Sequence, residues 1–300
     1  MGILAKAFAV SAAAAGAAYL GGPSLLDHIR RHQLLRSLNL GRPWDRGPTG
    51  DPPPPWTCAT DHKYTTQIIS VDPLLIYIAD FVHPSEAAAI IDMGTPLLAP
   101  SPLTGGPGAS DTTGHQSRTS WSAPLPLLDT PTAVGCVLAR ASALLGTLLA
   151  PGRDDVGAPQ MVRYEAGQRF DAHRDWFARP RLAPADAEAG RRRLYNRVAT
   201  LFVVLQANHS AGGETWFPHV GPFAAGKEEA AEEGEGKRVW REHEDGGLAF
   251  RAVPGNALFW VNLFPNGTGD ERVLHAGLPI KDGVKTAMNI WPRAYFGPDA

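Results

Sequence analysis

The sequence predicts an α+β fold, mostly β, in which helices precede a series of short strands. From residue 161 onward, segments rich in β-branched and aromatic side chains alternate with Gly, Pro and Asn turns. Helical patterns lie upstream of these segments. Elements in this order favour a β-sandwich or barrel that carries helices on one side. The chain has 300 residues, 44% of them hydrophobic, which is enough for one such domain plus extensions.

Individual elements can be placed along the chain. Residues 73–81 have the composition of a short strand, and the following helix is expected to start at Pro84 and to end at Gly94. Apolar residues recur every three or four positions over residues 134–149, which predicts an amphipathic helix that backs the sheet. Residues 197–206 are almost continuously apolar, as expected for a strand buried on both faces.

The N-terminal part has a different composition. No charged side chain occurs over residues 7–26, a length that could span a bilayer. We expect residues 1–26 to be a hydrophobic signal or membrane anchor, with a mitochondrial presequence or an exposed helix as alternatives. Residues 27–63 are Pro/Gly-rich and predict a stiff linker. Residues 64–300 then form the folded domain.

The signals for cell compartment point in two directions. Lys6 precedes the apolar stretch and three arginines follow it within residues 30–36, which by the positive-inside rule places the C-terminal side in the cytoplasm. Glycosylation sequons at Asn208 and Asn266 suit the secretory pathway instead. Cys58 and Cys136 are the two cysteines; they could pair in an oxidising compartment, or remain free.

The charge distribution argues against a nucleic-acid partner. The formal net charge is −2, and no basic cluster provides a footprint for phosphates. Residues 227–236 form an acidic run that is expected to be a solvated loop.

Three residues predict a metal site. His173 and Asp175 are two positions apart, so on a strand their side chains point the same way. His275 provides a third ligand, and two histidines plus one carboxylate form the facial set that leaves positions open on Fe(II). The sequence therefore predicts an oxygen-activating iron site. An isolated His-x-Asp pair would more often be a hydrogen-bonding pair or part of a solvated loop.

A lysine follows the third ligand at an interval of ten residues. Lys285 stands in the apolar run G-V-K-T-A-M-N-I-W, where a buried ammonium group needs an anionic partner. A dicarboxylate co-substrate would supply that partner. The alternative is a strand lysine that extends to solvent.

Further motifs accompany these residues in a fixed order. They are Arg118-Thr-Ser120, Tyr164-x-x-Gly167, G-G-E-T-W-F-P at residues 212–218 and P-G-x-A-L-F-W at residues 254–260. With the His-x-Asp pair, His275 and Lys285, they resemble the catalytic domain of prolyl 4-hydroxylases, which are Fe(II)- and 2-oxoglutarate-dependent dioxygenases. The resemblance spans roughly residues 66–296 and implies a double-stranded β-helix, or jelly-roll, core.

The resemblance also implies roles for individual residues. The catalytic set would be His173, Asp175, His275 and Lys285, with Lys285 on the distal carboxylate of 2-oxoglutarate. Tyr164 matches a tyrosine that contacts the co-substrate, and Thr215 is expected at the pocket wall. Arg118 and Ser120 are candidate substrate contacts, or else part of a turn with an exposed arginine. L-ascorbate is the expected reductant.

The implied activity is hydroxylation of prolyl residues in a Pro-containing polypeptide to 4-hydroxyproline, with succinate and CO2 as co-products. The implied location is the endoplasmic reticulum or secretory pathway, with membrane anchoring through residues 7–26. The same chemistry on another peptide residue or a small molecule is an alternative, as is a non-catalytic secretory binding module. The complete set of ligands and Lys285 favours an enzyme.

The chain departs from the family pattern between its second and third ligands. Asp175 and His275 are 100 positions apart, a longer interval than usual, because of extra residues after Trp176 and over residues 220–247. Inserts beside an active site usually change substrate access and leave the metal ligands in place.

Overall fold

The computed structural model describes residues 56–59, 61–102, 117–128, 131–221 and 238–300. The chain divides into two units, Met1–Pro55 and Trp56–Ala300, whereas the sequence placed the start of the folded domain at residue 64. The predicted anchor at residues 7–26 and the acidic run at residues 227–236 lie outside the described residues. Within the described ranges, no helix combines the length and apolar character needed to cross a membrane.

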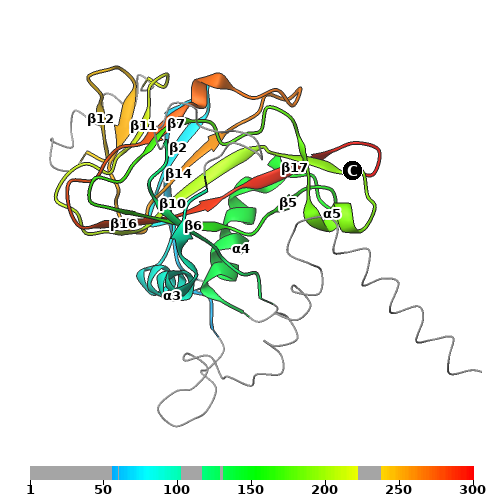
Figure 1. The fold of residues 1–300 in the computed structure, drawn as a ribbon, viewed down its shortest axis with the longest axis horizontal. Helices are drawn as coiled ribbons and strands as arrows, with labels where there is room; N and C mark the ends of the chain where they lie inside the picture. The colour runs from blue at the N-terminus through cyan, green and yellow to red at the C-terminus, as the bar shows by residue number, and fades with distance from the viewer. Residues whose placement is uncertain (1–55, 60, 103–116, 129–130, 222–237) are drawn as a thin grey trace, which may run out of the picture. The chain divides into compact units, whose positions relative to one another are not determined.

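Two antiparallel sheets form the centre of the second unit (Figure 1). The larger has eight strands in the order β1-β2-β14-β10-β16-β6-β4-β3, and the smaller has five in the order β12-β13-β11-β15-β7. The larger sheet contains β1 (Thr65–Ser70), β2 (Leu75–Ala79), β3 (Ala99–Pro100), β4 (Trp121–Pro124), β6 (Gln160–Glu165), β10 (Ala199–Ala207), β14 (Ala257–Val261) and β16 (Val284–Ile290). The smaller contains β7 (Phe170–His173), β11 (Thr215–Phe217), β12 (Trp240–Glu242), β13 (Leu248–Phe250) and β15 (His275–Gly277).

The two sheets face each other across an aromatic core, which gives the mostly β, double-stranded β-helix fold that the sequence predicted. Phe217 and Phe250 of the smaller sheet pack with Tyr77, Phe202 and Trp260 of the larger one. Strand β10 shows why its sequence lacks alternation. Phe202 and Val204 belong to this inner core. Leu201, Val203 and Leu205 belong to a second core on the outer face of the sheet. The prediction of a strand buried on both faces is therefore confirmed.

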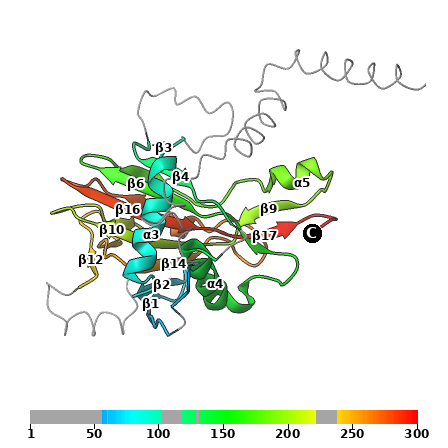
Figure 2. The same cartoon turned by 90° about the horizontal axis from the view of Figure 1, so that it is seen from below.

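Two helices cover that outer face, on one side of the larger sheet as predicted (Figure 2). Helix α3 (Pro84–Gly94) begins with a capping box in which His83 and Glu86 satisfy backbone N–H groups. Helix α4 (Ala133–Leu145) is capped by Thr132. Arg140 of α4 donates two hydrogen bonds of 2.9 Å to the Glu86 carboxylate, so a buried ion pair joins the two helices. Short 3-10 turns occupy Thr95–Leu97, Gly146–Leu148 and Glu271–Val273.

The extra residues after Trp176 build a third sheet beside the sandwich. Strands β8 (Arg181–Leu182) and β9 (Leu194–Arg197) pair with each other, with helix α5 (Pro184–Glu188) between them. Strand β9 also pairs with the C-terminal β17 (Pro292–Phe296), and β17 pairs with β5 (Asp155–Val156). Asp186 of α5 forms ion pairs with Arg191 and Arg193. The insert is thus an ordered extension of the domain.

A disulfide bond joins Cys58 to Cys136, which are 78 positions apart and have Cα atoms separated by 5.5 Å. It resolves the alternative that the sequence left open. The bond ties the segment that precedes β1 to helix α4, where Cys136 is buried.

The disulfide gives a first prediction. Replacing both cysteines (Cys58→Ser with Cys136→Ser) should lower the free energy of unfolding by about 4 kcal/mol, because a loop of this length would no longer be closed in the unfolded chain. Urea unfolding of the oxidised wild type and the double variant measures the difference. The wild type with its disulfide reduced is the matched control and should unfold at the same urea concentration as the variant. A variant as stable as the oxidised protein would contradict the assignment.

Candidate functional site

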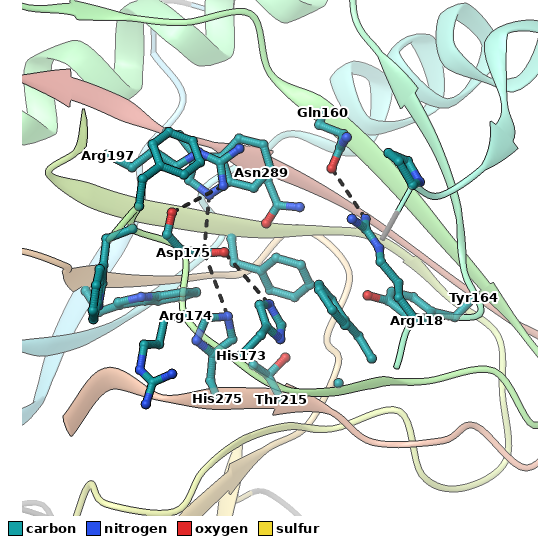
Figure 3. A pocket seen from close by; sticks show the side chains of 18 of the residues that line it. Arg118, Gln160, Tyr164, His173, Arg174, Asp175, Arg197, Thr215, His275 and Asn289 are labelled. Atoms are coloured by element: carbon teal, nitrogen blue, oxygen red, sulfur yellow. Dashed lines mark hydrogen bonds and ion pairs between the residues drawn. The ribbon is translucent and has the colours of Figure 1, made fainter. Parts of the chain in front are cut away.

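The predicted metal ligands meet where two strands of the smaller sheet pair. His173 is the last residue of β7 and His275 is the first residue of β15, and the two are direct partners in the antiparallel register. Asp175 lies just beyond the end of β7, in a bend, although the sequence placed it on the same strand as His173. Its carboxylate still turns toward both imidazoles (Figure 3).

The distances between the ligand atoms suit one metal ion. The Nε2 atom of His173 lies 3.8 Å from Oδ1 of Asp175, and Nε2 of His275 lies 3.8 Å from Oδ2. Two atoms that each lie about 2.1 Å from one ion can be at most about 4.2 Å apart. The set therefore fits a single ion, and its chemistry of two imidazoles and one carboxylate is the facial triad of non-haem Fe(II) oxygenases.

Backbone carbonyls fix the tautomer of both histidines. Nδ1 of His173 lies 2.8 Å from the carbonyl oxygen of Asp171, and Nδ1 of His275 lies 3.0 Å from that of Val273. A carbonyl oxygen only accepts, so each Nδ1 must carry the proton and donate it. The lone pair of each Nε2 is then available to a metal.

Electrostatics keep the ligands in the protonation states that metal binding needs. Burial, together with the nearby His275, lowers the pKa of His173 to about 3, so its imidazole is neutral at pH 7. Burial by itself would raise the pKa of Asp175. Electrostatic attraction to His275, His173 and Arg197 and the hydrogen bond from Trp291 outweigh burial and lower this pKa to about 2, so the carboxylate is ionised at pH 7. A neutral His173 imidazole beside an ionised Asp175 carboxylate is ready to bind a cation.

Hydrogen bonds hold the Asp175 carboxylate in place. Thr200 Oγ1 donates to Oδ2 over 2.8 Å, and Trp291 Nε1 donates to the same oxygen over 3.1 Å. Asn262 supports this arrangement by donating to Thr200 Oγ1 over 2.9 Å. Within the described residues, Oδ1 receives no hydrogen bond. Because Oδ2 is occupied by two donors, Oδ1 is the freer of the two oxygens for a metal.

A cavity of about 440 Å³ extends from the three ligands to Lys285. Lys285 lies on β16 opposite Tyr164 of β6 and is 2% exposed. Its Nζ donates to the carbonyl oxygen of Gly213 over 2.7 Å and to Thr215 Oγ1 over 3.5 Å. The rings of Tyr164 and Phe202 also surround it. In the part of the chain that the structure describes, no carboxylate lies within ion-pair distance of this ammonium group.

Burial without a counter-ion lowers the pKa of Lys285 to about 7. The cavity therefore offers a metal-binding triad at one position and, at another, a buried lysine with no ion-paired carboxylate among the described residues. This combination fits a dicarboxylate that meets the metal with one end and Lys285 with the other. Tyr164 and Thr215, which the sequence assigned to the co-substrate pocket, border the same cavity.

The two candidate substrate contacts differ in position. Arg118 borders the cavity, is 7% exposed and lies over the ring of Phe170, so it is not the exposed arginine of the alternative reading. Ser120 lies behind it. The Ser120 hydroxyl accepts a 3.0 Å hydrogen bond from Arg118 Nε and lies 2.9 Å from the Ser101 hydroxyl. Ser120 thus holds Arg118 in place.

Sequence reasoning did not identify Arg197, Thr200 or Trp291 as site residues. Arg197 and Trp291 border the cavity, and Thr200 lies behind Asp175. Thr200 is one of two polar residues in β10, with Gln206 near the other end, a signal that could have been noticed. No comparable local signal distinguishes Trp291, because it reaches Asp175 from a segment 116 positions away.

Other polar residues near the ligands have separate functions. The Asp171 side chain accepts a hydrogen bond from Arg169 over 2.8 Å, and His219 is exposed.

His243, Glu244 and Asp245 form a second group with closely spaced ligand atoms. They are consecutive residues in a turn, and both acids are exposed. His243 stacks against Trp216 with ring centroids 4.5 Å apart, which accounts for its position without a metal.

Comparisons with known proteins agree with the geometry. The family model of the 2OG-Fe(II) oxygenase superfamily matches residues 159–293. Prolyl 4-hydroxylase 13 of Arabidopsis thaliana is 28% identical over 225 residues, covering 75% of this chain and 73% of the plant protein. Prolyl 4-hydroxylase subunit alpha-3 of Rattus norvegicus is 28% identical over 234 residues, covering 76% of this chain but only 35% of that subunit. The viral collagen prolyl hydroxylase of Paramecium Bursaria Chlorella virus-1, solved as a 2OG complex, aligns with a TM-score of 0.49 and 19% identity, covering 79% of this chain and 99% of that one.

The hydrogen bonds on Asp175 give a second prediction. Trp291→Phe removes the donor to Oδ2 but keeps an aromatic ring beside Arg197, so the dissociation constant for Fe(II) should rise about tenfold. Anaerobic titration with Fe(II) measures it. Trp216→Phe is the control, since that indole donates to the carbonyl of Gly246 on the surface and does not border the cavity. Equal affinities in the two variants would show that Trp291 does not position the carboxylate.

Proposed function

The chain contains a prolyl 4-hydroxylase-like 2OG-Fe(II) oxygenase domain, and from this we propose that it hydroxylates prolyl residues in polypeptides to 4-hydroxyproline, with succinate and CO2 as co-products. The observation that carries the proposal is the pairing of two features in one cavity. A triad made of His173, Asp175 and His275 provides metal ligands, and Lys285 is a buried cation without a carboxylate partner among the described residues.

Each of these residues would have a separate function in the reaction. Fe(II) held by the triad would supply activation of dioxygen, with O2 as the oxidant and the decarboxylation of 2-oxoglutarate to succinate and CO2 as the source of two electrons, for hydroxylation of a C–H bond. Lys285, with Thr215 and Tyr164 beside it, would orient the co-substrate through its distal carboxylate. Phe170 and Trp260, which pack against the histidine rings, would help to exclude water from the reacting atoms. L-ascorbate is the proposed reductant for iron oxidised without substrate turnover.

We also propose that the protein works in the endoplasmic reticulum or secretory pathway. The Cys58–Cys136 disulfide supports this location, because disulfides persist mainly in oxidising compartments. The membrane anchor at residues 7–26 stays a prediction. Intact-mass analysis of the protein recovered from membranes and from medium tests cleavage of this segment and glycosylation at Asn208 and Asn266 together.

The activity is tested by succinate release. With Fe(II) and 2-oxoglutarate, a Pro-containing peptide should stimulate succinate formation, and the same peptide with Pro→Ala should not. His173→Ala should abolish the stimulated rate, because two remaining ligands do not hold the ion. His219→Ala, which removes an exposed histidine, should retain it. Equal stimulation by both peptides would exclude the prolyl specificity, and a fully active His173→Ala variant would exclude the site.

The pKa of Lys285 predicts how co-substrate binding depends on pH. In the free protein this pKa is about 7, and a bound carboxylate raises it, so binding above pH 7 requires uptake of a proton. The dissociation constant for 2-oxoglutarate should therefore be constant below pH 7 and should rise up to tenfold per pH unit above it. Calorimetry on metal-saturated protein between pH 6 and 9 measures this.

Lys285→Arg is the matched control for the pH series. Its guanidinium keeps the positive charge across this range, so its dissociation constant, even if larger at every pH, should not show the rise above pH 7. The same rise in both proteins would assign the effect to another group.

A further inference from the structure

With Fe(II) and 2-oxoglutarate bound, the residues that border the cavity would carry more positive than negative charge. The cationic residues are Arg118, Arg174, Arg181, Arg197 and Lys285, and Asp175 is the only carboxylate among the bordering residues that the structure describes. On the proposed function, Fe(II) and Lys285 bring three positive charges, and Asp175 and 2-oxoglutarate bring three negative ones. These cancel. Arg174 forms an ion pair with Glu271, and the other three arginines have no ion-paired carboxylate among the residues that the structure describes.

Two of these arginines, the buried Arg118 and the half-buried Arg197, are bonded to neutral groups. Arg118 donates to the Ser120 hydroxyl and, over 3.4 Å, to the side-chain oxygen of Gln160. Arg197 donates to the backbone carbonyl of Asp175 over 3.2 Å. A guanidinium group keeps its positive charge at pH 7. Within the described residues, neither guanidinium forms an ion pair with a carboxylate, although a buried charge is normally paired.

The third arginine belongs to the insert that the sequence identified. Arg181 is exposed on β8, and its guanidinium lies 3.9 Å from the centroid of the Phe177 ring. Arg197 lies 4.9 Å from the same centroid and 3.5 Å from that of Trp291. Two like charges therefore flank one ring at the cavity wall.

We propose that this wall binds an acidic side chain of the substrate, so that the enzyme prefers prolyl residues with an aspartate or glutamate within a few positions. A carboxylate beside Phe177 would compensate Arg181 and Arg197 together. Arg181, the exposed member, would meet the acidic residue first, and Arg197 would hold it deeper in the cavity. Arg118 reaches the cavity from a different side than Arg197 (Figure 3) and adds to the positive potential. Such a field favours anionic partners.

A different use of these arginines is the alternative that the experiment must separate. Guanidinium groups also donate to the backbone carbonyls of a peptide, and that interaction is independent of the charge of the peptide. Arginines used only in this way would bind neutral and acidic peptides equally.

The test compares two peptides with a single proline. One peptide has Glu on both sides of the proline, and the other has Gln at the same two positions. At low ionic strength, kcat/KM from succinate release should be about tenfold higher for the Glu peptide, and added salt should reduce this ratio. Arg181→Gln should lower the ratio to about two. Arg179→Gln removes the same charge from an exposed residue of the same insert that does not border the cavity, and should leave the ratio near that of the wild type.

A binding measurement separates this inference from the proposed function. Fluorescence polarisation with Zn(II)-loaded protein and 2-oxoglutarate reports peptide affinity without turnover, since Zn(II) has no redox chemistry. Tighter binding of the Glu peptide that is lost in Arg181→Gln supports the acidic preference, even if neither peptide is hydroxylated. Equal affinities for the two peptides, or equal ratios in the Arg181 and Arg179 variants, would overturn it.

Discussion

The site depends on the antiparallel register between β7 and β15. Their pairing sets His173 directly opposite His275, and a shift by one residue would turn one imidazole to the other face of the sheet. Packing secures the register from both sides. The ring of Phe170 stacks on His173 at 3.5 Å, and those of Phe217 and Trp260 lie 5.4 and 4.7 Å from His275. The aromatic core between the sheets is therefore also the support of the metal ligands.

The larger sheet places Lys285 in the cavity because side chains alternate between the two faces of strand β16. On β16, Lys285 and Asn289 face the cavity and Ala287 the inner core, whereas Met288 and Ile290 face the helices. A lysine is thereby buried inside a sandwich of apolar residues. Burying an ammonium group without a counter-ion costs stability, and the lowered pKa of Lys285 reflects this cost. A bound dicarboxylate would reduce this cost by pairing with the ammonium group. The desolvation of Lys285 that destabilises the free protein therefore favours binding of the co-substrate.

The insert after Trp176 forms part of the cavity wall, and its last strand contacts the metal site through the hydrogen bond from Arg197 to the backbone carbonyl of Asp175. It forms β8, α5 and β9 and is fixed by pairing with the C-terminal strand β17. It brings Phe177 and Arg181 to the cavity while His173, Asp175 and His275 stay grouped. The triad and this part of the cavity wall thus come from different segments of the chain, as expected when an ordered scaffold carries a variable rim.

The sequence by itself determined the chemistry and the layers. The types and order of the ligands, the buried lysine, the helix limits at Pro84 and Gly94, and a strand apolar on both faces all follow from residue identity and short-range periodicity. Tertiary structure alone decided that Trp291 and Thr200 hold one oxygen of Asp175, that Ser120 supports Arg118, that Cys58 pairs with Cys136, and that Arg197 lacks a carboxylate partner among the described residues. The physical reason is distance along the chain. Periodicity is a local property, whereas contacts between residues many positions apart are set by strand register and core packing, which no short segment specifies.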